Sequence, residues 1–175
     1  MEVMSLRRTE QVVDEIFDLY AEHGTSLYAG KKISRLEHMC QAARLAMQEG
    51  YDDEVILAAF LHDVGQLLPV HDENESMDGY GTMDHEKLGA DYLLKMGFSA
   101  RLCSLVTSHV KAPEYQGGRM SPEEAARFES DPLFDIYIKM HQWDEAARVE
   151  HQPLGDIGVF REKAVRHLEK SAVAV

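Results

Sequence analysis

The segment from Val55 to Leu61 restricts the fold of this chain more than any other, because each of its residues is apolar. It follows Asp52 and Asp53, and acids suit the positive end of a helix dipole. A helix that is apolar on nearly every side has to be surrounded by other elements. The sequence therefore predicts a central, buried helix that begins at Asp52 or Asp53 and continues to about Leu68.

Other segments repeat apolar residues at helical spacing, and no segment shows the convincing alternation of a strand. The acidic, glycine-bearing stretch from Pro69 to Asp84 predicts a long loop. We therefore expect an all-α protein, a single domain over residues 1–175 with about seven or eight helices. Besides the central helix, the predicted helices span about Thr9–His23, Ile33–Glu49, Asp84–Met96, Ser99–His109, a short segment capped by Ser121, Asp131 or Pro132 to Arg148, and Val159–Ala172, with a break from Pro113 to Gly118.

The charge of the chain limits its partners. Thirty-one acidic residues against eighteen basic ones give a net charge of −13, which repels nucleic-acid phosphates and anionic lipids. No stretch approaches the roughly twenty apolar residues of a membrane span. The first ten residues also lack the apolar core of a signal peptide. We therefore expect a cytoplasmic protein with neither a nucleic-acid nor a membrane partner.

Cys40 and Cys103 both lie within apolar helical patterns. A buried cysteine at such a position is more often a reduced thiol than half of a disulfide. The sequence thus predicts two free thiols, as expected in a reducing cytoplasm.

The doublet His62-Asp63 interrupts the most hydrophobic part of the sequence. Burial of an unpaired carboxylate there would be costly, so a compensating group is needed. A divalent cation is one such group, because imidazole and carboxylate are suitable ligands for zinc, manganese or iron. Adjacent helical residues point about 100° apart, close enough to reach one cavity. A structural hydrogen-bonded pair is the alternative interpretation.

Four more potential ligands lie in or at the ends of other predicted helices. Taken singly, each has an ordinary interpretation: a core histidine, a histidine of an exposed first turn, a cation at a helix C-terminus, or a solvated acid. Their occurrence together with the doublet favours a metal centre. The four residues are His38, His85, His109 and Asp144.

The order of these six residues resembles the metal-binding pattern of the HD-domain superfamily. The surrounding segments are similar to those of the mixed-valent di-iron oxygenases that cleave carbon–phosphorus bonds, and the resemblance extends from about Tyr28 to Arg148. It implies an HD-type helical bundle. The segments that carry it are Leu36-Glu37-His38, Ala59 to Gly65, Asp84 to Leu93, Tyr115-Gln116-Gly117-Gly118 and Trp143-Asp144-Glu145.

This resemblance implies two iron ions in the mixed-valent Fe(II)/Fe(III) state, with dioxygen as co-substrate. Asp63 would bridge the two ions, and His85 and His109 would hold the second. The first ion would then take His38, His62 and Asp144. The resemblance further implies an oxidoreductase of organophosphonate catabolism, a dioxygenase whose partner is a small-molecule hydroxyphosphonate, acting after a hydroxylase that supplies the 1-hydroxy group.

Substrate contacts follow from comparison with the glycine-forming member of that family. Its tyrosine that occupies an iron position until substrate arrives corresponds to Tyr28, which we expect to act as a gate. Lys31 stands where that member has a glutamate facing the substrate ammonium. Gln66 replaces a histidine of that member, and His141 replaces a phosphonate-binding arginine. Lys111 is the candidate to replace a phosphonate-binding lysine, although the segment before Tyr-Gln-Gly-Gly is shorter here.

These departures favour a trimethylammonium substituent, which needs no hydrogen bonds and prefers aromatic faces. The candidate aromatic side chains are Tyr20, Tyr28, Tyr80 and Trp143. We therefore expect oxidative C–P cleavage of a 1-hydroxy-2-(trimethylammonio)ethylphosphonate-type substrate to glycine betaine and phosphate. One alternative is a dioxygenase for 2-amino-1-hydroxyethylphosphonate that forms glycine. A metal-dependent HD phosphohydrolase would use the same ligands to activate water. A non-catalytic regulatory HD module would not need all six of them.

Overall fold

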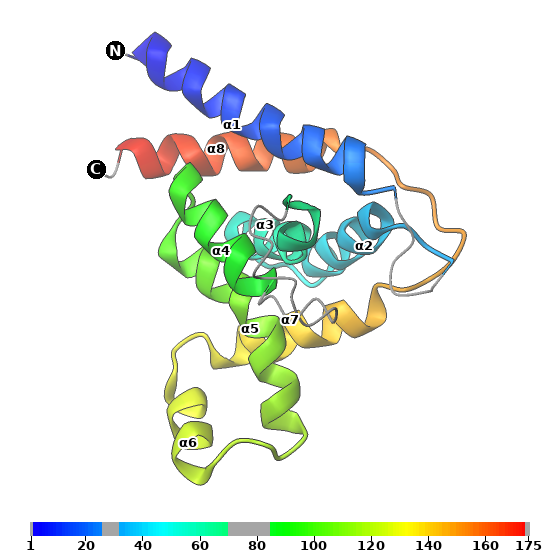
Figure 1. The fold of residues 1–175 in the computed structure, drawn as a ribbon, viewed down its shortest axis with the longest axis vertical. Coiled ribbons are helices and arrows are strands. Elements are labelled where there is room, and N and C mark those ends of the chain that lie inside the picture. The colour runs from blue at the N-terminus through cyan, green and yellow to red at the C-terminus, as the bar shows by residue number, and fades with distance from the viewer. Residues whose placement is uncertain (1, 26–31, 70–84, 174–175) are drawn as a thin grey trace.

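The computed structural model describes residues 2–25, 32–69 and 85–173, and within these ranges it contains helices and no extended strand (Figure 1). This confirms the all-α prediction. The elements are α1 (Glu2–His23), α2 (Arg35–Gln48), α3 (Asp53–Leu61), the 3₁₀ helix η1 (Val64–Leu67), α4 (His85–Met96), α5 (Ala100–Gln116), α6 (Pro122–Ser130), α7 (Phe134–Ala146) and α8 (Gly158–Val173).

Helix α3 forms the centre of the core, as its apolar sequence predicts. Its residues from Val55 to Leu61 are at most 4% exposed, and α2, α5, α7 and α8 pack around it. Phe60 lies between Tyr20 of α1 and Phe160 of α8, at ring-centroid distances of 4.8 and 4.7 Å. The Tyr20 hydroxyl also donates a hydrogen bond to the Phe60 carbonyl over 2.6 Å. The apolar run thus joins both ends of the chain to the centre.

The central helix is shorter than expected. It ends at Leu61, not near Leu68, and the doublet forms a turn before η1. Asp63 leaves the helical conformation, with φ −104° and ψ 14°, and Gly65 then packs directly against the backbone of α4. The end of α3 therefore coincides with a close tertiary contact between the turn and α4.

Helix α5 is longer than expected. It continues through Pro113 to Gln116, whereas the sequence predicts an end at His109. Proline removes one backbone donor inside a helix, but packing outweighs this loss. Ala112 is fully buried, and the Tyr115 ring contacts Phe128 and Phe134 at 5.3 Å between centroids. These contacts hold the last turn of α5 against α6 and α7.

Two smaller expectations have definite outcomes. Cys40 and Cys103 are buried and free, and their burial is the placement that their apolar helical patterns predict. Helix α1 begins at Glu2, several residues before the predicted start at Thr9. No helix in the described part of the chain combines the length and the apolar character that crossing a membrane requires.

Candidate metal centre

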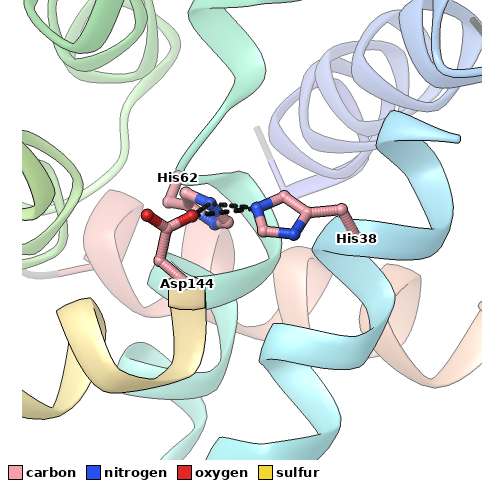
Figure 2. Close-up of side chains that lie close together, drawn as sticks. All are labelled: His38, His62 and Asp144. Carbon is pink, nitrogen blue, oxygen red and sulfur yellow. Dashed lines mark hydrogen bonds and ion pairs between the residues drawn. The ribbon is translucent and has the colours of Figure 1, made fainter. Parts of the chain in front are cut away.

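Three predicted ligands from three elements meet in the interior (Figure 2). His38 lies on α2, His62 directly follows α3, and Asp144 is near the end of α7. The His38 Nε2 atom lies 3.1 Å from His62 Nε2 and 2.9 Å from Asp144 Oδ1. The His62 Nε2 atom lies 3.2 Å from the same carboxylate oxygen. Both histidines are almost completely buried, at 0% and 2% exposure.

Backbone carbonyls determine which nitrogen of each imidazole faces inward. The Nδ1 atom of His38 donates to the Ala147 carbonyl at 2.7 Å, and that of His62 donates to the Ala59 carbonyl at 2.6 Å. A carbonyl only accepts hydrogen bonds, so each Nδ1 carries a proton. In the neutral imidazole, Nε2 is then left with its lone pair.

This arrangement fits a metal cation. Two Nε2 lone pairs and a carboxylate oxygen face one another within 3.2 Å, which is repulsive unless a positive charge lies among them. Imidazole nitrogen and carboxylate oxygen bind divalent metals at about 2.0–2.2 Å, so ligand atoms around one ion lie about 3 Å apart. Hydrogen bonds from Nδ1 to carbonyls are also what orients histidines in known metal sites.

Asp63 connects this group to a fourth histidine. Its Oδ2 atom lies 3.7 Å from His38 Nε2 and 3.6 Å from His62 Nε2, while Oδ1 lies 3.8 Å from His109 Nε2. The two oxygens therefore face different groups of nitrogens. The Nδ1 atom of His109 donates to the Val106 carbonyl at 2.5 Å, which directs its Nε2 toward Asp63. This placement is compatible with a carboxylate that faces two neighbouring groups of ligands.

His85 begins α4 and is half-buried. Its Nδ1 atom is buried and has no hydrogen-bond partner within the described part of the chain. Its backbone lies against Gly65, two residues after Asp63. The fold thus brings the backbone of His85 to the turn that carries the doublet, and its ring nitrogen is available to a ligand.

Burial and the neighbouring charges shift the pKa values of three groups of the cluster. Burial alone would lower the pKa of His62, but the charges of Asp63 and Asp144 outweigh this and raise it to about 9. Burial alone would raise the pKa of Asp144, but hydrogen bonds from His38 and His62 hold it well below its usual range. The pKa of His109 is lowered, first by burial and then by the charge of His62. A metal ion would replace the proton on His62.

Two arginines next to the carboxylates were missed by the sequence reasoning. Arg35 Nη1 lies 3.4 Å from Asp63 Oδ2. Arg148 Nη2 lies 3.9 Å from Asp144 Oδ2, and its Nε donates to the Asp144 carbonyl. The only signal in the sequence is helical spacing, because Arg35 precedes His38 by three residues and Arg148 follows Asp144 by four.

The predicted substrate contacts lie in different places. His141 has a possible ligand atom within 4.8 Å of those of Asp144 and Glu145, and its Nδ1 is buried without a hydrogen-bond partner in the described residues. Tyr28, like Lys31, lies outside the described residues. Of these predicted contacts, His141 is the one that lies close to the predicted ligand Asp144.

Gln66 and Lys111 are not brought to the cluster. Gln66 is exposed on η1 and lines a surface cavity of about 430 Å³ beside the end of α1. Lys111 lines a cavity of about 650 Å³ between α5, α6 and α7. It lies two residues after His109, and so projects from nearly the opposite side of α5. Their roles as substrate contacts stay predictions.

The fold and this site define the class of protein. The family model of the HD domain matches residues 35–135, more than half of the chain. The chain belongs to the HD-domain family. The match contains five of the six predicted ligands, and Asp144 lies beyond it.

Curated relatives resemble nearly the whole chain. The chain is 30% identical to the hydroxymethylphosphonate dioxygenase of Gimesia maris, covering 97% of this chain and 95% of that protein. It is also 30% identical to the [1-hydroxy-2-(trimethylamino)ethyl]phosphonate dioxygenase (glycine-betaine-forming) of Leisingera caerulea, covering 91% of each. The uncharacterized protein L432 of Acanthamoeba polyphaga mimivirus is 34% identical over 92% of this chain and 84% of its own length.

Proposed function

We propose that this protein is an iron- and dioxygen-dependent enzyme that cleaves the C–P bond of a 1-hydroxyphosphonate and releases phosphate. The observation that carries the proposal is the placement of Asp63, whose two oxygens face His38 and His62 on one side and His109 on the other. A carboxylate shared in this way suits two ions better than one. The names of the two dioxygenase relatives supply the reaction class.

Each predicted ligand has a place in this proposal. His38, His62 and Asp144 would hold one iron, His85 and His109 the other, and Asp63 would bridge the pair. Bound as a mixed-valent Fe(II)/Fe(III) pair, the iron would supply the redox chemistry with dioxygen. The overall reaction balances when the hydroxyl-bearing carbon becomes a carboxylate and the phosphonate becomes phosphate, each gaining one oxygen atom from O₂.

The charges around the cluster support an anionic substrate. The chain as a whole is strongly acidic, with a net charge of −13, so a phosphonate has to be attracted locally. Arg35 and Arg148 lie beside Asp63 and Asp144, and guanidinium groups bind phosphonate-type oxygens well. His141 lies near Asp144, and its Nδ1 atom has no hydrogen-bond partner among the described residues, so it is a suitable further donor to the same anion.

The finer proposal is that the substrate carries a trimethylammonium group. The relative from Leisingera caerulea, whose name specifies a trimethylamino substrate, supports this choice. Tyr20 and Trp143, two candidate aromatic faces for the cation, are buried in packing contacts with Phe60 and Tyr51. Tyr28 and Tyr80 are the remaining candidates and lie outside the described residues.

A second candidate substrate is hydroxymethylphosphonate, because a relative with this activity in its name is equally similar to the chain. It shares the hydroxyl and the phosphonate with the first candidate and lacks the cationic substituent. The reacting end of the site would therefore be the same, and the pocket for the substituent would decide between them.

The test is oxygen uptake and phosphate release by iron-loaded protein with each hydroxyphosphonate, the 2-amino compound included. We expect one phosphate for each O₂ consumed, and the highest kcat/KM with the trimethylammonium substrate. Asp144→Asn should lose turnover, while Asp91→Asn, an exposed aspartate on α4, should retain it. Phosphate released from a hydroxyphosphonate without oxygen would contradict the oxygenase. Phosphate released from a phosphomonoester without oxygen, with manganese, cobalt or nickel in place of iron, would instead identify a phosphohydrolase.

A further inference from the structure

Gly65 and Gly89 form an unusually close contact between η1 and α4. A β-carbon built on Gly65 would lie 1.8 Å from the carbonyl oxygen of His85 and 2.8 Å from its carbonyl carbon. One built on Gly89 would lie 2.9 Å from the Gly65 nitrogen and 3.2 Å from its Cα. All three nearest neighbours of the Gly65 β-carbon are backbone atoms, so no side-chain rotation relieves that contact. The Gly89 β-carbon also meets the Val64 side chain, with Cγ1 at 3.2 Å. Even alanine at position 65 requires the two elements to separate.

This contact lies between two candidate ligands of the second ion. Gly65 is two residues after Asp63, and Gly89 is one helical turn after His85. Both Gly65 and Gly89 are buried. The separation between the doublet turn and the first turn of α4 is therefore set by backbone packed directly on backbone.

His85 depends on this contact more than the other histidines do. His38, His62 and His109 each have Nδ1 hydrogen-bonded to a backbone carbonyl. In the described part of the chain, the buried Nδ1 of His85 has no such bond. The position of the His85 imidazole thus follows from where α4 lies, and α4 begins at this residue.

We infer that Gly65 is a positioning residue for the second metal ion, and that it acts through His85. Gly89 contributes to the same contact from the other side. The inference rests on the proposed function insofar as it requires a two-ion centre. It predicts that a methyl group at position 65 weakens the second ion and leaves the first ion, held by His38, His62 and Asp144, in place.

The experiment measures metal stoichiometry and stepwise affinity of purified full-length protein by anaerobic Fe(II) titration. Wild type should bind two ions. Gly65→Ala should weaken the second ion by about 100-fold, and Gly89→Ala by about 10-fold because its clash is milder, with the first ion unchanged. Gly158→Ala is the matched control, since its added β-carbon would meet a flexible Asp156 side chain at the start of α8.

A double-mutant cycle separates positioning from general destabilisation. In a His85→Ala background, Gly65→Ala should cause no further loss of second-ion affinity, because the ligand it positions is absent. Circular dichroism establishes that each variant is folded. If Gly65→Ala does not fold, the same cycle with Gly89→Ala decides the matter.

Three outcomes would overturn the inference. In these outcomes, a folded Gly65→Ala protein binds both ions as wild type does, loses both ions equally, or adds its full effect to that of His85→Ala. If wild type binds two ions, each of these outcomes contradicts the positioning role and leaves the proposed function standing. A wild-type protein that retains fewer than two ions contradicts the proposed function as well.

Discussion

The two halves of the candidate metal centre are held in different ways. In the first half, His38, His62 and Asp144 have ligand atoms within 3.2 Å of one another. In the second half, Asp63 Oδ1 and His109 Nε2 are 3.8 Å apart, and His85 is placed by the docking of α4 onto η1. The ligands of the first half are thus held close together within the core, whereas those of the second half depend on the contact between η1 and α4.

The difference follows from where the ligands lie. His38 and His62 are attached to α2 and the end of α3, which pack extensively on each other and on α7. The ion of the first half therefore occupies a site that the core has already formed. We expect this ion to bind first and more tightly, because less of the chain has to be ordered around it. The second ion should depend on Asp63 and on the position of α4.

The largest expected effect is from Asp63→Ala. This change removes the one carboxylate that faces both halves, so we expect the second ion to be lost, the first to be weakened and turnover to stop. Metal content after gel filtration, measured by mass spectrometry, checks the prediction. Asp91→Ala is the control. Two ions per chain in the Asp63→Ala protein would contradict the bridging role.

The next largest effect is on the stability of the metal-free protein, which we expect His38→Ala to lower more than His85→Ala does. His38 is fully buried and satisfies the Ala147 carbonyl, so its loss creates a cavity and leaves a buried acceptor unpaired. We expect a cost of about 2–4 kcal/mol in the free energy of unfolding. His85 is half-buried and its Nδ1 lacks a hydrogen bond among the described residues, so we expect less than about 1 kcal/mol.

Urea unfolding of both variants measures the two costs. Equal destabilisation would mean that the first half is no more a part of the core than the second. A value for His85→Ala larger than that for His38→Ala would reverse the comparison.

Much of the fold could be predicted from the sequence, since helical spacing and the apolar run of α3 are local signals. The failures lie where tertiary contacts override them. The end of α3 at Leu61 depends on a contact between Gly65 and α4, which is remote in sequence. The passage of α5 through Pro113 depends on Tyr115 packing on Phe128 and Phe134. No local pattern reports such contacts.

Some residues of the candidate site could be predicted from the sequence, and others could not. The doublet within an apolar run requires a compensating charge, and the family resemblance then supplies the other ligands. In the structure, His38, His62 and Asp144 lie close together, and Asp63 lies near His109. These residues are far apart in sequence, so no spacing rule predicts their distances. Arg35 and Arg148 carry no sequence signal beyond their distance from His38 and Asp144, so their closeness to the carboxylates needed the fold.

A smaller effect is the pH dependence of stability in the metal-free protein. The folded-state pKa of His62 is about 9, above its ordinary value of 6.5. Its contribution to stability is therefore complete below pH 6.5 and is lost as pH rises toward 9. We expect the thermal midpoint to fall on the order of 5 °C over this range. In metal-loaded protein the fall should be smaller, because the ion replaces the proton.

Thermal unfolding from pH 6.5 to 9, with and without metal, measures this effect. The gap between the loaded and metal-free midpoints should widen as pH rises, because metal competes with the His62 proton only below its pKa. His151→Asn, a change of an exposed histidine between α7 and α8, provides the control for effects away from the cluster. A gap that stays constant would show that the proton on His62 does not compete with metal.

The smallest expected effect uses the two thiols as reporters of the two halves. Cys40 is two residues after His38 and fully buried, and Cys103 lies on α5, six residues before His109, and is 7% exposed. Burial raises the pKa of both thiols to about 11, so at neutral pH each reacts slowly and through local opening. We expect Cys103 to be alkylated about tenfold faster than Cys40, as peptide mass spectrometry would measure. Equal rates would show that α2 and α5 open together, and that the first and second halves of the centre belong to one cooperative unit.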